Sequence, residues 1–214
     1  MARSGKATVE LEQPDGLEQR YGIELPYTVK LRLRGTSPFL FNRMDIDAYD
    51  REAGPGAKKK PRERAAYESM IWRDEQGKLA LPTRNVIGSI ASVGKYFYGP
   101  TRGKSTMKAP VQEGVVPGEE YAHFGVDSWD AIDFRHAKHG NTAKTPKPTY
   151  RPRLEIGWAL ETTLLVTVPE VLGPATLLEL ISKAGGAMGV GDGRKIGFGR
   201  YVLDGHELGE GLPW

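Results

Sequence analysis

The chain has 214 residues, 27 glycines, no cysteine and a formal net charge of +3. Average usage would give roughly 15 glycines in a chain of this length. The absence of cysteine excludes disulfides, thiol catalysis and thiolate metal sites, and it fits a reducing compartment. No apolar run is long enough to span a membrane, and the first residues lack the apolar core of a secretory signal. We therefore expect a cytoplasmic protein with one domain that carries insertions.

The first predicted element is a strand at residues 27–34, with the sequence YTVKLRLR. Its apolar side chains alternate with Lys30, Arg32 and Arg34, which indicates one buried face and one basic face. A pair of short strands with a turn at residues 74–77 is expected to follow. The first strand is therefore predicted to lie in a sheet with one open, basic side.

Two helices are predicted from apolar side chains at helical spacing. The first covers residues 83–97, with Thr83 as its N-cap. The second begins near Pro174, a proline suited to the first turn of a helix, and ends at Gly185. Both are expected to pack against the sheet through their apolar stripes.

Alternation of apolar and polar residues is strongest at 154–168. Fifteen residues at about 3.3 Å each would span roughly 50 Å, so we expect a curve or kink, with Gly157 as the candidate position. A strand near 115–124 and a last strand at 198–203 complete the pattern, while the rest of 98–150 lacks a clear period.

The order of these elements is β-α-β-β-α-β. It predicts an α+β fold of the ferredoxin-like type, shared with RNA-recognition motifs, with an antiparallel sheet and two helices on one face. Large basic loops are expected as insertions at 42–66 and at 98–150, the second forming a thumb or a small lobe. The predicted domain covers 27–204, between a flexible segment at 1–26 and a C-terminal tail at 205–214.

Basic residues gather in three Gly/Pro/Lys-rich stretches, at 58–64, at 102–108 and at 135–153. The third stretch holds six Lys or Arg residues and no Asp or Glu. Basic loops beside a compact body are typical of a nucleic-acid-binding protein. The alternative is that these loops are solvated and serve solubility.

The glycine excess is concentrated at 185–199, where GGAMGVGDGRKIGFG contains seven glycines. This stretch joins the second helix to the last strand, so neither a Rossmann fingerprint nor a Walker A loop fits its order and spacing. Its glycines allow positive φ and close approach of another backbone, and its N–H groups could form an anion-binding nest. Within it, Gly189-Val190-Gly191 and Gly197-Phe198-Gly199 read as G-h-G-x5-G-h-G, where h is hydrophobic.

That spacing resembles the C-terminal glycine-rich loop of the RAMP superfamily, the repeat-associated RNA-binding proteins of CRISPR systems. The stretches GTSPFLFNRMD, LPTRNVIGSIASVGKYF and RPRLEIGW resemble segments of the backbone subunit of class 1 CRISPR effectors, or of a short phage-borne relative. The resemblance implies a non-catalytic subunit that forms a filament of its own copies along a guide RNA. The implied partners are that guide, a complementary RNA or DNA target and other effector subunits, with no membrane.

The resemblance and the basic clusters together predict binding by backbone phosphates, largely independent of base sequence. The glycine-rich loop is assigned to Gly189, Gly191, Gly193, Gly197 and Gly199. The candidate nucleic-acid-binding residues are Asn42, Arg43, Lys58, Lys59, Lys60, Arg62, Arg64, Arg84, Asn85, Ser89, Arg102, Lys104, Lys108, Arg194 and Lys195.

Two other functions stay open at this point. Some RAMP relatives cut RNA with an aspartate after the first segment, and Asp45 and Asp47 fall close to that position. The chain could also be a phage protein that binds or anneals single-stranded DNA. His136 and His139 are three residues apart without an evident third ligand, so no metal or other cofactor is expected.

Overall fold

The computed structural model describes residues 25–43, 67–99, 105–137 and 146–211. It is an α+β structure with two antiparallel sheets and, in these ranges, three α-helices and one 3-10 turn. None of the helices in the described ranges is long and apolar enough to cross a membrane. The helices and the 3-10 turn are α4 (Thr83–Gly94), α5 (Lys108–Gly114), α6 (Pro174–Ala187) and η1 (Arg194–Ile196).

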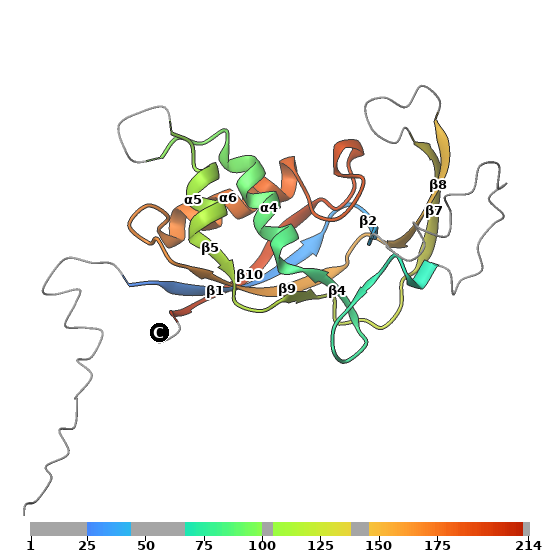
Figure 1. Ribbon diagram of the computed structural model, residues 1–214, viewed down its shortest axis with the longest axis horizontal. Coiled ribbons are helices and arrows are strands. Elements are labelled where there is room, and N and C mark those ends of the chain that lie inside the picture. The colour runs from blue at the N-terminus through green and yellow to red at the C-terminus, as the bar shows by residue number, and fades with distance from the viewer. Residues whose placement is uncertain (1–24, 44–66, 100–104, 138–145, 212–214) are drawn as a thin grey trace, which may run out of the picture.

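The larger sheet has seven strands in the order β10-β1-β9-β6-β4-β3, with β5 also paired to β9. All three helices lie on one side of it (Figure 1). One more helix is present than was predicted, because α5 is short and contains Pro110, so it carries no helical period that sequence reasoning could detect. The strands are β1 (Tyr27–Gly35), β3 (Trp72–Arg73), β4 (Leu79–Pro82), β5 (Val115–Pro117), β6 (Tyr121–His123), β9 (Ala159–Val166) and β10 (Tyr201–Glu210).

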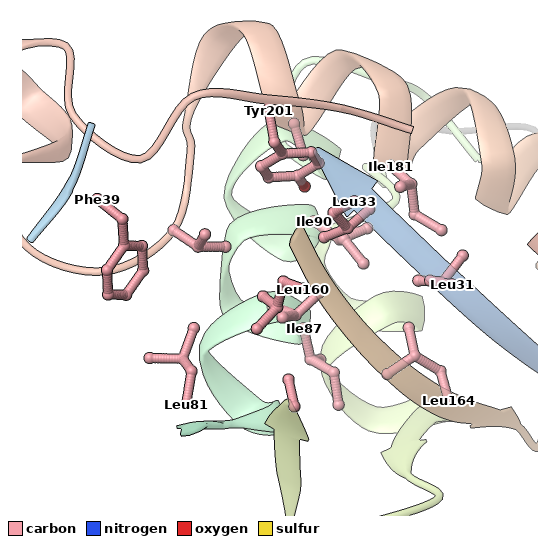
Figure 2. Close-up of a cluster of buried hydrophobic side chains, with 14 of the residues drawn as sticks. Leu31, Leu33, Phe39, Leu81, Ile87, Ile90, Leu160, Leu164, Ile181 and Tyr201 are labelled. Atoms are coloured by element: carbon pink, nitrogen blue, oxygen red, sulfur yellow. The ribbon is translucent and has the colours of Figure 1, made fainter. Parts of the chain in front are cut away.

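The predicted alternation of β1 is confirmed. Val29, Leu31 and Leu33 are fully buried, and the residues between them are exposed. Leu160 and Leu164 of β9 point into the same core, where side chains of α4 and α6 cover them (Figure 2). At roughly 1.5–3 kcal/mol for each fully buried aliphatic side chain, this layer supplies the main driving force for folding.

The second sheet has three strands, ordered β2-β8-β7. They are β2 (Phe39–Leu40), β8 (Lys147–Leu154) and β7 (Ala131–Ala137), and they stand at one end of the large sheet (Figure 1). Much of the predicted 98–150 insertion therefore forms helices and strands. It is divided between the two sheets and α5, and it does not form one separate lobe in the described ranges.

The long alternating stretch at 154–168 starts at the last residue of β8, in the second sheet, and continues as β9, in the large sheet. The chain turns at Gly157, which has a φ of 95°, and the backbone there exchanges hydrogen bonds with Gly35. Gly157 N donates to Gly35 O at 3.0 Å, and Gly35 N donates to Trp158 O at 2.7 Å. The expected kink is thus a complete change of sheet.

Several element boundaries differ from prediction: α4 ends at Gly94 and not at 97, and β10 begins at Tyr201 and not at 198. Pro82 occupies the N-cap position of α4, and the hydroxyl of Thr83 instead meets that of Thr162 at 3.1 Å inside the core. The helix α6 runs two residues past Gly185. The last strand continues to Glu210 through pairing with β1, so residues 205–210 belong to the sheet and not to a tail. The segment at 1–24 lies outside the described residues.

Candidate nucleic-acid interface

The glycine-rich loop is a crossing of two backbone segments. Gly199 has a φ of 66°, and a Cβ built on it would lie 1.8 Å from the carbonyl oxygen of Val190. Val190 N in turn donates to Gly199 O at 2.9 Å. A side chain at position 199 is excluded both by the backbone conformation and by the neighbouring carbonyl. The two G-h-G units therefore stack directly on each other.

The same loop docks on the segment around β2. Gly199 N donates to Pro38 O at 2.8 Å, and Asp192 N donates to Leu40 O at 3.0 Å. At Gly191, a Cβ would lie 2.5 Å from the ring of Phe39. The spacing of the motif thus matches two contact points, one at each end of β2.

Most donors of the loop are already used. Seven N–H groups donate to main-chain carbonyls within the protein, those of Gly189, Val190, Asp192, Ile196, Gly197, Phe198 and Gly199. These groups cannot serve as the anion-binding nest that the glycine content suggested. The glycines act mainly by letting main chains approach each other, and charge at this site comes from side chains.

Exposed polar and cationic residues flank the contact between β2 and the loop. Leu40 and Asp192 form an antiparallel bridge. Asn42 and Arg43 leave it in one direction, and Arg194 and Lys195 of η1 leave it in the other, with all four exposed. We call residues 38–43 and 189–200 the loop platform.

One face of the second sheet presents arginines to the loop platform. Arg135, Arg151 and Arg153 share this face by register, and each is paired with a carboxylate. Asp133, with 8% of its side chain exposed, pairs with Arg135 and lies 3.8 Å from Arg153. Part of the basic stretch at 135–153 is therefore internally neutralised.

The opposite face of this sheet is aromatic. Phe134 packs on Tyr150 with ring centroids 4.7 Å apart, and Tyr150 continues to Tyr67 at 6.4 Å. Tyr67 meets Trp129, whose indole N–H donates to Glu68 at 3.2 Å. Phe134 at the end of this row is 52% exposed. The row extends the core along the second sheet and ends at the surface.

The predicted basic face of the large sheet is balanced by acids. Lys30, Arg32 and Arg34 are exposed there as expected, but Asp204 lies 3.2 Å from Arg34 and 4.0 Å from Arg32. Glu161 stands opposite Arg32 across the β1–β9 ladder. The open face is therefore mixed in charge, and its β1 residues add no aromatic ring on which a base could stack.

The structure separates several other candidate residues from the loop platform. Arg84 is exposed at the start of α4, where it lines a surface groove with Glu119 and Glu120, and Asn85 is half-buried beside it. Lys108 begins α5, at the opposite end of the helical layer from η1 (Figure 1). Lys58, Lys59, Lys60, Arg62, Arg64, Arg102, Lys104, Asp45 and Asp47 lie outside the described residues.

Ser89 is a core residue and is not available to an external phosphate. It is 0% exposed, and the fully buried Tyr201 lies close to its hydroxyl. Burial raises the pKa of Tyr201, an effect that the Ser89 hydroxyl opposes. The small side chain of Ser89 suits the packing of α4 on β10. The position of Ser89 in the helix therefore reflects the core and not a binding role.

An acidic cluster lies at the far edge of the large sheet. Asp74 Oδ2 is 3.0 Å from His123 Nδ1, and Glu119 Oε2 is 3.5 Å from His123 Nε2. Burial would raise the pKa of Asp74, but hydrogen bonds from Lys78 N–H, His123 and Gln76 N–H outweigh it and lower the pKa. Among the described residues, no group of three His, Asp or Glu side chains is arranged to hold a metal ion.

Sequence reasoning did not assign site roles to Asp192, Phe134 or Arg200. Arg200 sits at the base of the loop platform, where its main-chain N–H donates to Ser37 Oγ at 2.8 Å. The sequence signals for Asp192 and Phe134 were an acid within the glycine motif and an aromatic residue next to the basic stretch at 135–153. Neither signal indicates a partner without knowledge of the strand register.

No protein-family model matches this sequence, and no curated protein sequence matches it either. Among solved structures, the chain is similar to one from the "Cryo-EM structure of the Type III-B Cmr-beta bound to cognate target RNA". The TM-score is 0.51 at 13% identity, over 92% of this chain and 65% of that one. The likeness shows a shared fold, and this chain spans about 65% of the length of the other.

A second similar structure is that of Cmr6 from Pyrococcus furiosus. The TM-score is 0.47 at 11% identity, over 85% of this chain and 100% of that one.

Proposed function

We propose that this protein is a RAMP-type subunit of a CRISPR effector complex that binds guide RNA without cutting it. The binding surface is the loop platform. The RNA is held through its phosphates and not through a particular base sequence. The proposed setting is the cytoplasm, with further copies of the chain and other effector subunits as neighbours.

The observation that carries the proposal is the pair of exposed cationic groups on either side of the Leu40–Asp192 bridge. Arg43 stands on one side, and Arg194 and Lys195 stand on the other. Cations fixed on a rigid crossing of two main chains can neutralise successive phosphates of one strand at little entropic cost. The open face of the large sheet offers no comparable surface, because Asp204 and Glu161 accompany its arginines.

The fold supports the same proposal. The strands β10, β1, β9 and β5 are neighbours in that order, and each adjacent pair is antiparallel. With α4 between β1 and β5 and α6 between β9 and β10, this order supports the proposed ferredoxin-like arrangement. The fold is also shared with a chain of an RNA-bound Type III-B complex. Fold alone does not fix function, so the charge of the loop platform has to be tested directly.

The test begins with nucleic acid that co-purifies with the protein. We expect RNA of defined length, which ribonuclease A removes and DNase I leaves intact. The stripped protein is then titrated with labelled single-stranded RNA. Its affinity for this RNA should fall roughly tenfold or more when Arg194 and Lys195 are both changed to Glu. The slope of log affinity against log salt should fall by about 1 for each cation removed.

The matched control reverses two exposed lysines outside the loop platform, Lys78 and Lys183. This variant carries the same charge change and should bind within a factor of about three of the wild type. Equal losses in both variants would show that net charge alone governs binding and would contradict the proposed site. Preferential binding of single-stranded DNA, or cleavage of a complementary RNA that Asp45→Ala abolishes, would contradict the proposed role.

A further inference from the structure

We infer that Asp192 is a positioning residue: its ion pair with Arg151 holds the second sheet against the glycine-rich loop and so sets the geometry of the loop platform. Asp192 Oδ2 lies 3.0 Å from Arg151 Nε. The Arg151 side chain is 16% exposed and that of Asp192 is 38% exposed. Arg151 Nη1 also donates to Tyr150 O at 2.9 Å. This guanidinium is therefore held within the fold and is a poor candidate for direct contact with a phosphate.

The ion pair spans the short strand β2. Leu40 pairs with Arg153 of β8 on one side and bridges to Asp192 on the other. Arg151 lies two residues from Arg153 and so on the same face of the sheet. The Asp192 side chain thus reaches across a two-residue strand to the next one. A strand this short offers few main-chain hydrogen bonds, so the ion pair supplies a contact that the ladder cannot.

A second contact closes the other end of the same loop. The Arg135 guanidinium lies over the ring of Phe198, 4.2 Å from its centroid. The Asp133 carboxylate also pairs with that guanidinium. The contacts at 192 and 198 therefore bracket η1, the turn that carries Arg194 and Lys195. Movement of the second sheet would change where these two cations stand.

Removing the Asp192 charge distinguishes two roles for this residue, because the two roles predict opposite changes in RNA affinity. If Asp192 merely lowers the local positive potential, Asp192→Asn should bind RNA more tightly. If it holds the second sheet in place, the same change leaves a largely buried guanidinium without its carboxylate and loosens the sheet. We expect the second result, a loss of roughly tenfold in RNA affinity despite the gain of one positive charge.

The control is Asp204→Asn, which removes an exposed carboxylate from the open face of the large sheet, where it faces Arg32 and Arg34. It makes the same change in net charge without touching the second sheet, and its RNA affinity should be equal to that of the wild type or higher. The double variant Arg151→Asp with Asp192→Arg restores an ion pair of reversed direction. It should recover most of the affinity lost in Asp192→Asn.

The inference rests on the proposed function for its affinity readout, so a second measurement is independent of RNA. Amide hydrogen exchange at residues 131–137 and 194–198 should become about tenfold faster in Asp192→Asn and stay unchanged at residues 29–33 of β1. Unchanged exchange in the second sheet, or RNA affinity at or above wild type, would overturn the positioning role. If the wild type binds no RNA, the proposed function fails, and the exchange rates alone decide on Asp192. If Asp192→Asn unfolds as a whole, the same two measurements on Arg151→Lys decide.

Discussion

The two sheets of this protein are both antiparallel, but they are held in place by different forces. The large sheet is held by leucine and valine side chains of β1 and β9 beneath α4 and α6, with Leu31, Leu33 and Leu160 fully buried. The second sheet is joined to the glycine-rich loop by arginines paired with carboxylates and by main-chain contacts at glycine. Apolar packing depends on volume and tolerates adjustment, whereas a main-chain crossing and an ion pair depend on exact geometry. Substitutions should therefore affect the two regions in different ways.

The largest effect is expected at the main-chain crossing. Gly199→Ala places a Cβ against the carbonyl of Val190 and requires a residue with a side chain at a φ of 66°. We expect a loss of about 4 kcal/mol or more in the free energy of unfolding, measured by urea denaturation. Gly197→Ala is the matched control, because its φ is also positive, at 95°, while no described atom beyond its chain neighbours lies within 4 Å of the added Cβ. It should cost only about 1–2 kcal/mol, and equal losses would contradict the crossing as the reason for the motif.

A core substitution in the large sheet should come next. Leu160→Ala removes a fully buried side chain from β9, with an expected loss of about 2–5 kcal/mol in the free energy of unfolding. Phe134→Ala on the second sheet removes a larger side chain that is 52% exposed, and it should cost less than about 1.5 kcal/mol. If Phe134→Ala cost more than Leu160→Ala, the second sheet would be the apolar scaffold and the comparison would fail.

The smallest effect is expected from pH at the edge of the large sheet. The pKa of Asp74 lies below its ordinary value of 3.8, so its carboxylate stabilises the fold above that pH. This contribution should be lost as the pH falls through 3.8 towards the lower folded-state pKa. The difference in unfolding midpoint between wild type and Asp74→Asn, measured in urea, should therefore be smaller at pH 3 than at pH 6. A difference that grows on acidification would contradict the hydrogen bonds assigned to this carboxylate.

Local patterns in the sequence predicted the parts of the fold that local physics determines. The alternation of β1 predicts its buried face, and Pro174 marks the start of α6. The turn at Gly157 was expected from the sequence, but the change of sheet there could not be predicted, because the apolar parity continues through residues 155–158. The turn there is stabilised by hydrogen bonds with Gly35, more than a hundred residues away in the chain.

The candidate site was predicted less completely, for a similar reason. The spacing of Gly189, Gly191, Gly197 and Gly199 indicated a special loop, and the structure explains it by contacts with Pro38, Leu40 and Phe39. Counting basic residues could not show that Arg151 and Arg135 are paired with carboxylates, because the partners are set by register and tertiary contact. Nor could it distinguish Ser89 in the core from the exposed Arg84 five residues earlier.

The central claim is that RNA lies on the loop platform and not on the open face of the large sheet. Ultraviolet crosslinking of the wild-type protein to single-stranded RNA, followed by mass spectrometry of the adducts, tests it most directly. We predict adducts within residues 38–43 and 189–200 that disappear when Arg194 and Lys195 are changed to Glu. Adducts confined to the β1 residues 28–34, or a pattern unchanged in that variant, would contradict the account.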